Sequence, residues 1–207
     1  VSNKARHGPP MEELPKVEVA LTLNGGEEDK EIRRRQGNKA LQQHRILRMV
    51  DECREQGGNL TQEDLADILK VSTRTIQRNI KELKKAGFTV PTRGIVGDIG
   101  PSISHKTRIV KLYLEGKTYS EIGRISRHSP YSIKRYIESF IQVIFLHKKG
   151  LKIRGINYSI GISPRLIKEY LELYVKYNTS EYRDRIKDLL LTVDSKENLK
   201  KGMKIIR

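Results

Sequence analysis

The stretch from Leu60 to Gly87, LTQEDLADILKVSTRTIQRNIKELKKAG, decides the fold. It predicts a helix, a tight turn and a second helix that ends at a glycine. The second helix carries Ile76, Ile80 and Leu83 on one side. Its opposite side carries polar residues, which are Thr73, Arg74, Thr75, Gln77 and Arg78. A buried stripe opposite a basic polar face is typical of a helix that packs on its own domain and meets DNA.

Composition and charge point to a class of partner. The chain has 207 residues, and its 41 Lys and Arg against 25 Asp and Glu give a formal net charge of +16. An excess of that size fits a polyanion, and nucleic acid is the default. Charge alone would also fit a ribosomal or a membrane-surface protein, so it supports nucleic acid only beside a motif. A hydrophobic content of 36% suits several small helical cores better than one thick core.

Two features of the sequence indicate a cellular compartment that agrees with a nucleic-acid partner. The lone Cys53, which we expect to face the core, excludes an intramolecular disulfide and fits a reducing cytoplasm. The chain shows no signal peptide and no apolar run of membrane-spanning length. We therefore expect a cytoplasmic, nucleoid-associated protein without a membrane partner.

The quoted stretch supplies the second and third helices of a three-helix module over residues 38–97. Asn38 is the expected N-cap of the first helix, which runs to about Gln56. After Gly87, two short β-prone runs predict the wing of a winged helix, with Arg93 near its tip. An ordinary exposed loop is the alternative for this segment.

The unit recurs along the chain. A gapless shift of 57 residues places Ser72 on Ser129 and Thr61 on Thr118, and a further shift of 34 residues places Ser129 on Ser163. The same shifts superpose apolar positions, such as Leu65 with Ile122 and Ile156, and Ile76 with Ile133 and Ile167. The sequence therefore predicts one helix-turn-helix that is written three times.

The second and third copies, at 98–140 and 138–177, are expected to share a helix. No Gly or Pro separates Tyr131 from Lys149, so one helix would serve as recognition helix of the second copy and first helix of the third. In contrast, the joint at residues 97–101 is rich in glycine and would let the first copy swing.

The three copies differ in their suitability for DNA. The expected base readers of the first copy are Thr73, Arg74 and Gln77, beside Thr75 on the same face. Its expected phosphate contacts are Arg78, Lys81, Lys84 and Arg93. The second copy offers candidates around its turn, which are Arg127, His128, Tyr131, Ser132, Lys134 and Arg135. In the third copy acidic residues balance the basic residues, so we expect this copy to pack against its neighbours or to serve a protein partner or a homodimer.

Two further segments flank the three copies. Residues 1–37 form an N-terminal arm with a short edge strand at 17–23 and a helix that begins at the acids of 27–31. Residues 178–207 form a short helix over 180–191 and a basic tail.

Two resemblances add to this pattern. The segment VSTRTIQRNIKELKKAG (71–87) is similar to the helix-turn-helix of DeoR-type winged-helix regulators. A longer stretch resembles a bacterial and archaeal family of unknown function with tandem helix-turn-helix units. The residues that carry it are ALQQHRILRMV (40–50), LTQEDLADILKVSTRTIQR (60–78), VPTRGIVGDIGPSISHKTRIVKLYLEGKTYSEI (90–122), RHSPYSIKRYI (127–137) and SPRLIKEYLELY (163–174). This longer resemblance implies an architecture of tandem helix-turn-helix units. A sugar-phosphate effector domain of the DeoR type is not recognisable in this sequence.

Enzymatic functions find no support in the sequence. The histidines at 7, 44, 105, 128 and 147 show no metal-ligand spacing, and no phosphate-cradling glycine loop is present. We therefore expect a protein that is not an enzyme and that needs neither a metal nor a cofactor.

The sequence as a whole predicts a mainly α fold of tandem helix-turn-helix units, the first one winged. The predicted function is sequence-specific binding of double-stranded DNA, as a transcription regulator. One alternative is the DNA-end-binding module of a transposase or recombinase whose catalytic part lies elsewhere. Another is a sigma-like or adaptor protein whose last copy binds another protein.

Overall fold

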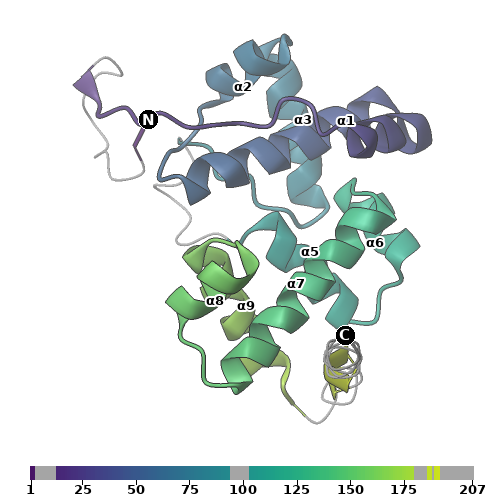
Figure 1. Ribbon diagram of the computed structural model, residues 1–207. Coiled ribbons are helices and arrows are strands. Elements are labelled where there is room, and N and C mark those ends of the chain that lie inside the picture. The colour runs from purple at the N-terminus through teal and green to yellow at the C-terminus, as the bar shows by residue number, and fades with distance from the viewer. Residues whose placement is uncertain (3–12, 94–102, 180–185, 188, 192–207) are drawn as a thin grey trace, which may run out of the picture.

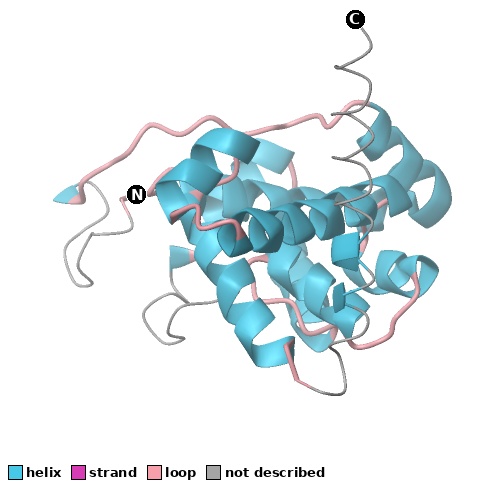
Figure 2. Ribbon diagram, turned by 60° about the horizontal axis from the view of Figure 1, so that its bottom comes forward, coloured by secondary structure: helices cyan, strands magenta, loops and turns pink. Residues whose placement is uncertain are grey.

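The computed structural model describes residues 1–2, 13–93, 103–179, 186–187 and 189–191 and confirms a mainly helical chain, with no β-strand in these ranges (Figure 2). Figure 1 places the first three helices above the later ones. The helices are α1 (Glu27–Glu55), α2 (Gln62–Leu69), α3 (Thr73–Lys85), α5 (His105–Leu114), α6 (Tyr119–Ser126), α7 (Pro130–Lys148), α8 (Ile153–Ile160) and α9 (Pro164–Tyr177).

Helix α1 begins at the predicted acids and is a hairpin of two arms, 27–36 and 38–55. The arms meet at Gly37, whose φ of 83° and ψ of 176° are open essentially only to glycine. Asp29 holds the arms together, because its carboxylate accepts hydrogen bonds of 2.8 Å from both Arg45 and Arg48. On a straight helix Arg45 would lie about 24 Å further along the axis. Burial raises the pKa of Asp29, but the hydrogen bonds outweigh it and lower the pKa to about 2.

The predicted edge strand at 17–23 is wrong. The segment pairs with no strand among the described residues and lies along α1 instead. Gln56 exchanges two hydrogen bonds of 2.8 Å with the backbone of Ala20, and Glu52 Oε2 accepts from the Thr22 N–H at 2.8 Å. The alternating pattern reflects packing on the hydrophobic core by Val19 and Leu21.

Three helix pairs share one local plan, α2 with α3, α6 with α7, and α8 with α9. The first helix of each pair ends at a residue in the left-handed conformation, with φ of 53°, 60° and 68° at Lys70, Arg127 and Gly161. These three residues coincide under the gapless shifts of the sequence. Two residues later a serine side chain caps the second helix, and the predicted caps are all present at Ser72, Ser129 and Ser163.

The starts of the first helices are also related. Thr61 forms a capping box with Asp64, and Thr118 forms one with Glu121, so each pair satisfies two backbone N–H groups. The third copy has Lys152 at this position and no side-chain cap. Helix α7 runs unbroken over its 19 residues, as the sequence predicted.

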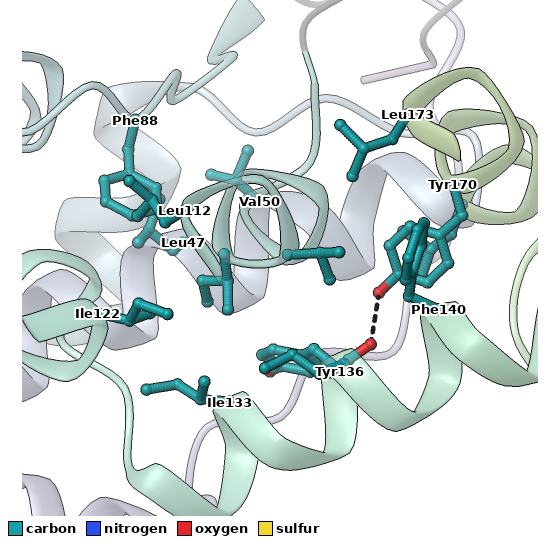
Figure 3. Close-up of a cluster of buried hydrophobic side chains, with 14 of the residues drawn as sticks. Leu47, Val50, Phe88, Leu112, Ile122, Ile133, Tyr136, Phe140, Tyr170 and Leu173 are labelled. Atoms are coloured by element: carbon teal, nitrogen blue, oxygen red, sulfur yellow. Dashed lines mark hydrogen bonds between the residues drawn. The ribbon is translucent and has the colours of Figure 1, made fainter. Parts of the chain in front are cut away.

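One hydrophobic core connects the helices of all three pairs. Figure 3 shows Leu47 from α1 and Phe88 from the segment after α3 close to side chains of α5, α6 and α7. At the far end of this cluster the Tyr170 hydroxyl donates to the Tyr136 carbonyl at 3.5 Å. The expected swing of the first copy does not agree with a shared core. The joint at 97–101 itself lies outside the described residues.

The remaining expectations concern Cys53, the wing and the C-terminal flank. Cys53 is buried, as predicted. The wing is not confirmed, because 88–92 contain no strand and 94–97 lie outside the described residues. Of the predicted helix at 180–191, the described residues 186, 187 and 189–191 are helical. The tail at 192–207 lies outside the described residues. No helix in the described ranges is both long and apolar enough to cross a membrane.

Candidate nucleic-acid interface

Helix α3 presents a continuous polar face to solvent. Its apolar stripe is buried, with Ile76 at 0% and Leu83 at 2% exposure. The predicted contact residues on the opposite side are exposed, namely Arg74, Gln77, Arg78, Lys81 and Lys84. Thr73 and Thr75 are half-buried, and the Thr75 hydroxyl lies 2.9 Å from that of Ser72. The two threonines therefore belong to the rim of the turn.

The single acid of α3 is occupied by α1. Glu82 Oε1 accepts from Lys39 Nζ at 2.6 Å, and Oε2 accepts from Gln43 Nε2 at 2.8 Å. The hydrogen bond from Lys39 is the main cause of the lowered pKa of Glu82. The five basic side chains of α3 have no carboxylate partner within the described residues, and these are Arg74, Arg78, Lys81, Lys84 and Lys85. The face therefore carries uncompensated positive charge.

The predicted contact residues on α7 divide into exposed and covered ones. Tyr131 is 70% exposed, Lys134 is exposed, and the Arg135 side chain is 54% exposed. The Arg135 guanidinium lies 6.0 Å from the centre of the Tyr131 ring and 5.5 Å from that of Tyr136. These side chains form a second polar face at the start of α7.

Two predictions in this copy are wrong, since His128 and Ser132 are 1% and 0% exposed and cannot reach a ligand on the surface. Ser132 is covered by the first arm of α1, which lies across the beginning of α7. The Ser132 hydroxyl donates to Glu28 Oε1 on that arm, and Glu28 Oε2 lies 3.9 Å from Arg135 Nη2. His128 packs behind the turn, with Nδ1 2.6 Å from the Ser126 carbonyl oxygen.

The Arg127 side chain packs against α1 and is not free to contact DNA. Its left-handed backbone places the side chain against α1, where its Nε donates to Gln43 Oε1 at 3.2 Å. Gln43 is itself 2% exposed and donates to Glu82 at 2.8 Å and to Asn79 at 3.3 Å. One buried amide therefore joins helix α3 to the turn before α7. This link fixes the two polar faces relative to each other.

A cluster of three buried histidines lies beside this link. The rings of His44 and His128 are 4.4 Å apart between centroids, and those of His105 and His128 are 4.9 Å apart. Burial, followed by the positive charge of Arg48, lowers the pKa of His44 to about 3. Burial, followed by the neighbouring histidines, lowers the pKa of His128 well below its usual value. The three are far apart in sequence, and no local signal predicted that they meet.

The histidine cluster is a packing contact between α1, α5 and the turn before α7. Asp51 Oδ2 lies 2.5 Å from His105 Nδ1 and accepts from the His105 backbone N–H at 3.2 Å. Burial would raise the pKa of Asp51, but the contact with His105 lowers it. In the described part of the chain, no group of three or more His, Cys, Asp or Glu has an arrangement that could hold a metal ion.

The last two candidate regions are engaged elsewhere. The Arg93 N–H donates to the Leu60 carbonyl at 2.9 Å, so the segment after α3 returns to the start of α2. In the third pair, Glu169 Oε2 accepts from the Ser104 N–H at 2.9 Å and from the Thr107 hydroxyl at 2.8 Å. This carboxylate binds the N-terminal end of α5, which agrees with the expectation that the third copy packs against its neighbours.

Comparison with known proteins gives one match. Neither the curated proteins nor the solved structures compared with the chain gave a match. Residues 1–173 match a protein family described as "Protein of unknown function (DUF1670)". The match covers every helix from α1 to α8 and most of α9. The chain therefore belongs to the family of unknown function DUF1670.

Proposed function

We propose that this protein binds specific double-stranded DNA as a transcription regulator, with tandem helix-turn-helix units. In this proposal α3 enters one major groove and the start of α7 contacts an adjacent one. The observation that carries it is the exposed face of α3. Its basic side chains lack carboxylate partners in the described structure, whereas its one acid is bound by Lys39 and Gln43.

The side chains fall into two proposed roles. Arg and Gln form paired hydrogen bonds with guanine and adenine edges, so Arg74 and Gln77 read bases. Arg78, Lys81 and Lys84 contact phosphates, which position the protein without reading sequence. On α7 the proposed contacts are Tyr131, Lys134 and Arg135.

Selection of binding sites from a random pool of duplex DNA tests the proposal. The expected result is a composite site with two base patterns at one fixed spacing, because Gln43 and the shared core join α3 to α7. Insertion of five base pairs between the patterns should abolish the gain in affinity that comes from contacting both patterns at once. Insertion of ten should abolish it too, since a rigid protein cannot stretch by the roughly 34 Å of an added helical turn. No enrichment from the pool would refute specific binding.

Variants separate the two roles. Arg74→Ala and Gln77→Ala should relax base preference at two positions, at a cost of about 1–3 kcal/mol for the preferred base pair. Lys81→Ala and Lys84→Ala should weaken all sequences alike and reduce the salt dependence by about one ion each.

A matched control tests whether the effect comes from α3 or from net charge. Lys176 is exposed in the last turn of α9, as Lys84 is in the last turn of α3. Lys176→Ala removes one positive charge from the unit that we do not place on DNA. If Lys176→Ala weakened binding as much as Lys84→Ala, affinity would follow total charge and the assignment of α3 would be wrong.

A further inference from the structure

A cavity of about 320 Å³ lies where α1, α5, α7 and the turn from α8 to α9 meet. Its size is at the lower end of the range of about 300–1,000 Å³ for pockets that bind small molecules. The cavity is unrelated to the exposed face of α3, and the proposed DNA contacts make no use of it apart from Arg135. It combines a charged end with an apolar end.

The charged end is lined by three cations and one acid, which are Arg48, Lys106, Arg135 and Glu52. Glu52 already accepts a hydrogen bond of 2.8 Å from the Thr22 N–H. The carboxylates that pair with the three cations, Asp29, Glu55 and Glu28, do not line the cavity. The walls therefore offer mainly hydrogen-bond donors with positive charge.

Two buried nitrogens of the lining residues have no partner in the described structure. Arg48 is bound through its terminal nitrogens, which donate to Asp29 at 2.8 and 3.3 Å, while its Nε is buried without an acceptor in the described structure. His105, 3% exposed, faces Asp51 with Nδ1, and its Nε2 is buried without a partner. Buried polar groups are rarely left unpaired, and each exception calls for an explanation. Both nitrogens are closed to solvent, so the donors that a ligand in the cavity can reach belong to the more exposed cations, Lys106 and Arg135.

The opposite end of the cavity is apolar. Ile160 and Ile162 of the α8–α9 turn line it, together with Leu166 and Tyr170 of α9. Both isoleucines are half-buried, so they pack on the hydrophobic core and still present carbon to the cavity. A ligand that fits both ends has an anionic head and a short hydrocarbon body.

We propose that this cavity binds a small organic carboxylate with a short apolar body. The carboxylate accepts hydrogen bonds from Lys106 and Arg135, and the hydrocarbon body lies on Ile160, Ile162 and Leu166. Charge-assisted hydrogen bonds to a carboxylate are short and strong, which favours an anion over a neutral ligand of equal size. Arg135 is the residue that this site shares with the proposed DNA contacts, but the test below measures ligand binding alone, so its outcome does not depend on the function proposed above.

The test uses the full chain with isotope-labelled isoleucine methyl groups, titrated with hexanoate and, separately, with hexan-1-ol of the same chain length. Hexanoate should shift the Ile160 and Ile162 methyl signals in a saturable way, and it should bind at least about tenfold more tightly than hexan-1-ol. Benzoate serves as a second carboxylate with a different body. Equal binding of the alcohol and the acid would overturn the assignment of the charged end.

Two variants and one control locate the binding. Ser139→Phe fills the cavity from α7 and should abolish the hexanoate shifts. Lys106→Met should weaken hexanoate by about tenfold while it leaves hexan-1-ol unchanged. Lys111→Met, on the same helix but outside this cavity, should change neither. The proposal fails if neither hexanoate nor benzoate shifts the isoleucine signals at millimolar concentration, or if both cavity variants bind hexanoate like the native chain.

Discussion

Lowering the pH from 7.5 to 5 should destabilise this protein through its buried histidines. In the folded chain the pKa of His44 is lowered to about 3, and that of His128 is lowered well below its usual value. In the unfolded chain both titrate near 6.5. The unfolded state therefore binds more protons below pH 6.5, so stability is complete above that pH and falls as the pH decreases toward 3.

The expected size follows from His44. Between pH 7.5 and 5 the unfolded state gains about 2 kcal/mol from protonation at this one residue, whereas the folded state gains almost nothing. His128 acts in the same direction. The paired carboxylates do not contribute in this interval, because the pKa of Asp29 is about 2 and that of Asp51 is lowered. A loss of 2 kcal/mol or more is large against the ~5–15 kcal/mol that stabilises a typical domain.

Urea denaturation at several pH values between 5 and 7.5 measures this loss. His44→Gln removes one titrating ring and should reduce the pH dependence by about 2 kcal/mol. The matched control is His147→Gln, since His147 is exposed near the end of α7. An unfolding free energy that changed by less than about 1 kcal/mol over this interval, or an unaltered pH dependence in His44→Gln, would contradict the buried neutral cluster.

Three further predictions concern the backbone and its caps. Gly37→Ala should cost about 1–3 kcal/mol in urea denaturation, because φ 83° with ψ 176° is closed to alanine. Gly161→Ala should cost less, about 1–2 kcal/mol, because the left-handed region is open to other residues and Lys70 and Arg127 already occupy it; the reverse order would show that the α1 hairpin does not depend on Gly37. Thr118→Ala should lower thermal stability by about 0.5–2 kcal/mol through loss of the capping box, whereas Ser120→Ala, exposed in the same helix, should change little.

Local signals in the sequence predicted local structure well. The serine caps and the unbroken α7 follow from residues within a few positions of each other, and the gapless shifts align the three serines. The same shifts align Lys70, Arg127 and Gly161, although only the glycine is a residue that ordinarily signals a left-handed turn. At Lys70 and Arg127 the left-handed turn could therefore be predicted from the position in the repeat, although the residue type alone gave no signal.

The failures all depend on contacts between distant residues. Ser132 stands where a recognition helix would read bases, but Glu28, 104 residues earlier, covers it. Nothing near Ser132 predicts that contact, because it depends on the reversal of α1 at Gly37. The strand prediction at 17–23 failed for a similar reason, since alternation is necessary for a strand but a neighbouring strand is also required.

Helix α7 is a rigid connection between the second and third helix pairs. Its first turn belongs to one polar face, and its later turns are buried against α8 and α9. One inserted residue in its middle would rotate everything downstream by about 100° and advance it by about 1.5 Å. Such a change would move the α8–α9 turn away from the cavity and Glu169 away from α5. Members of the family should therefore keep the number of residues in α7 constant.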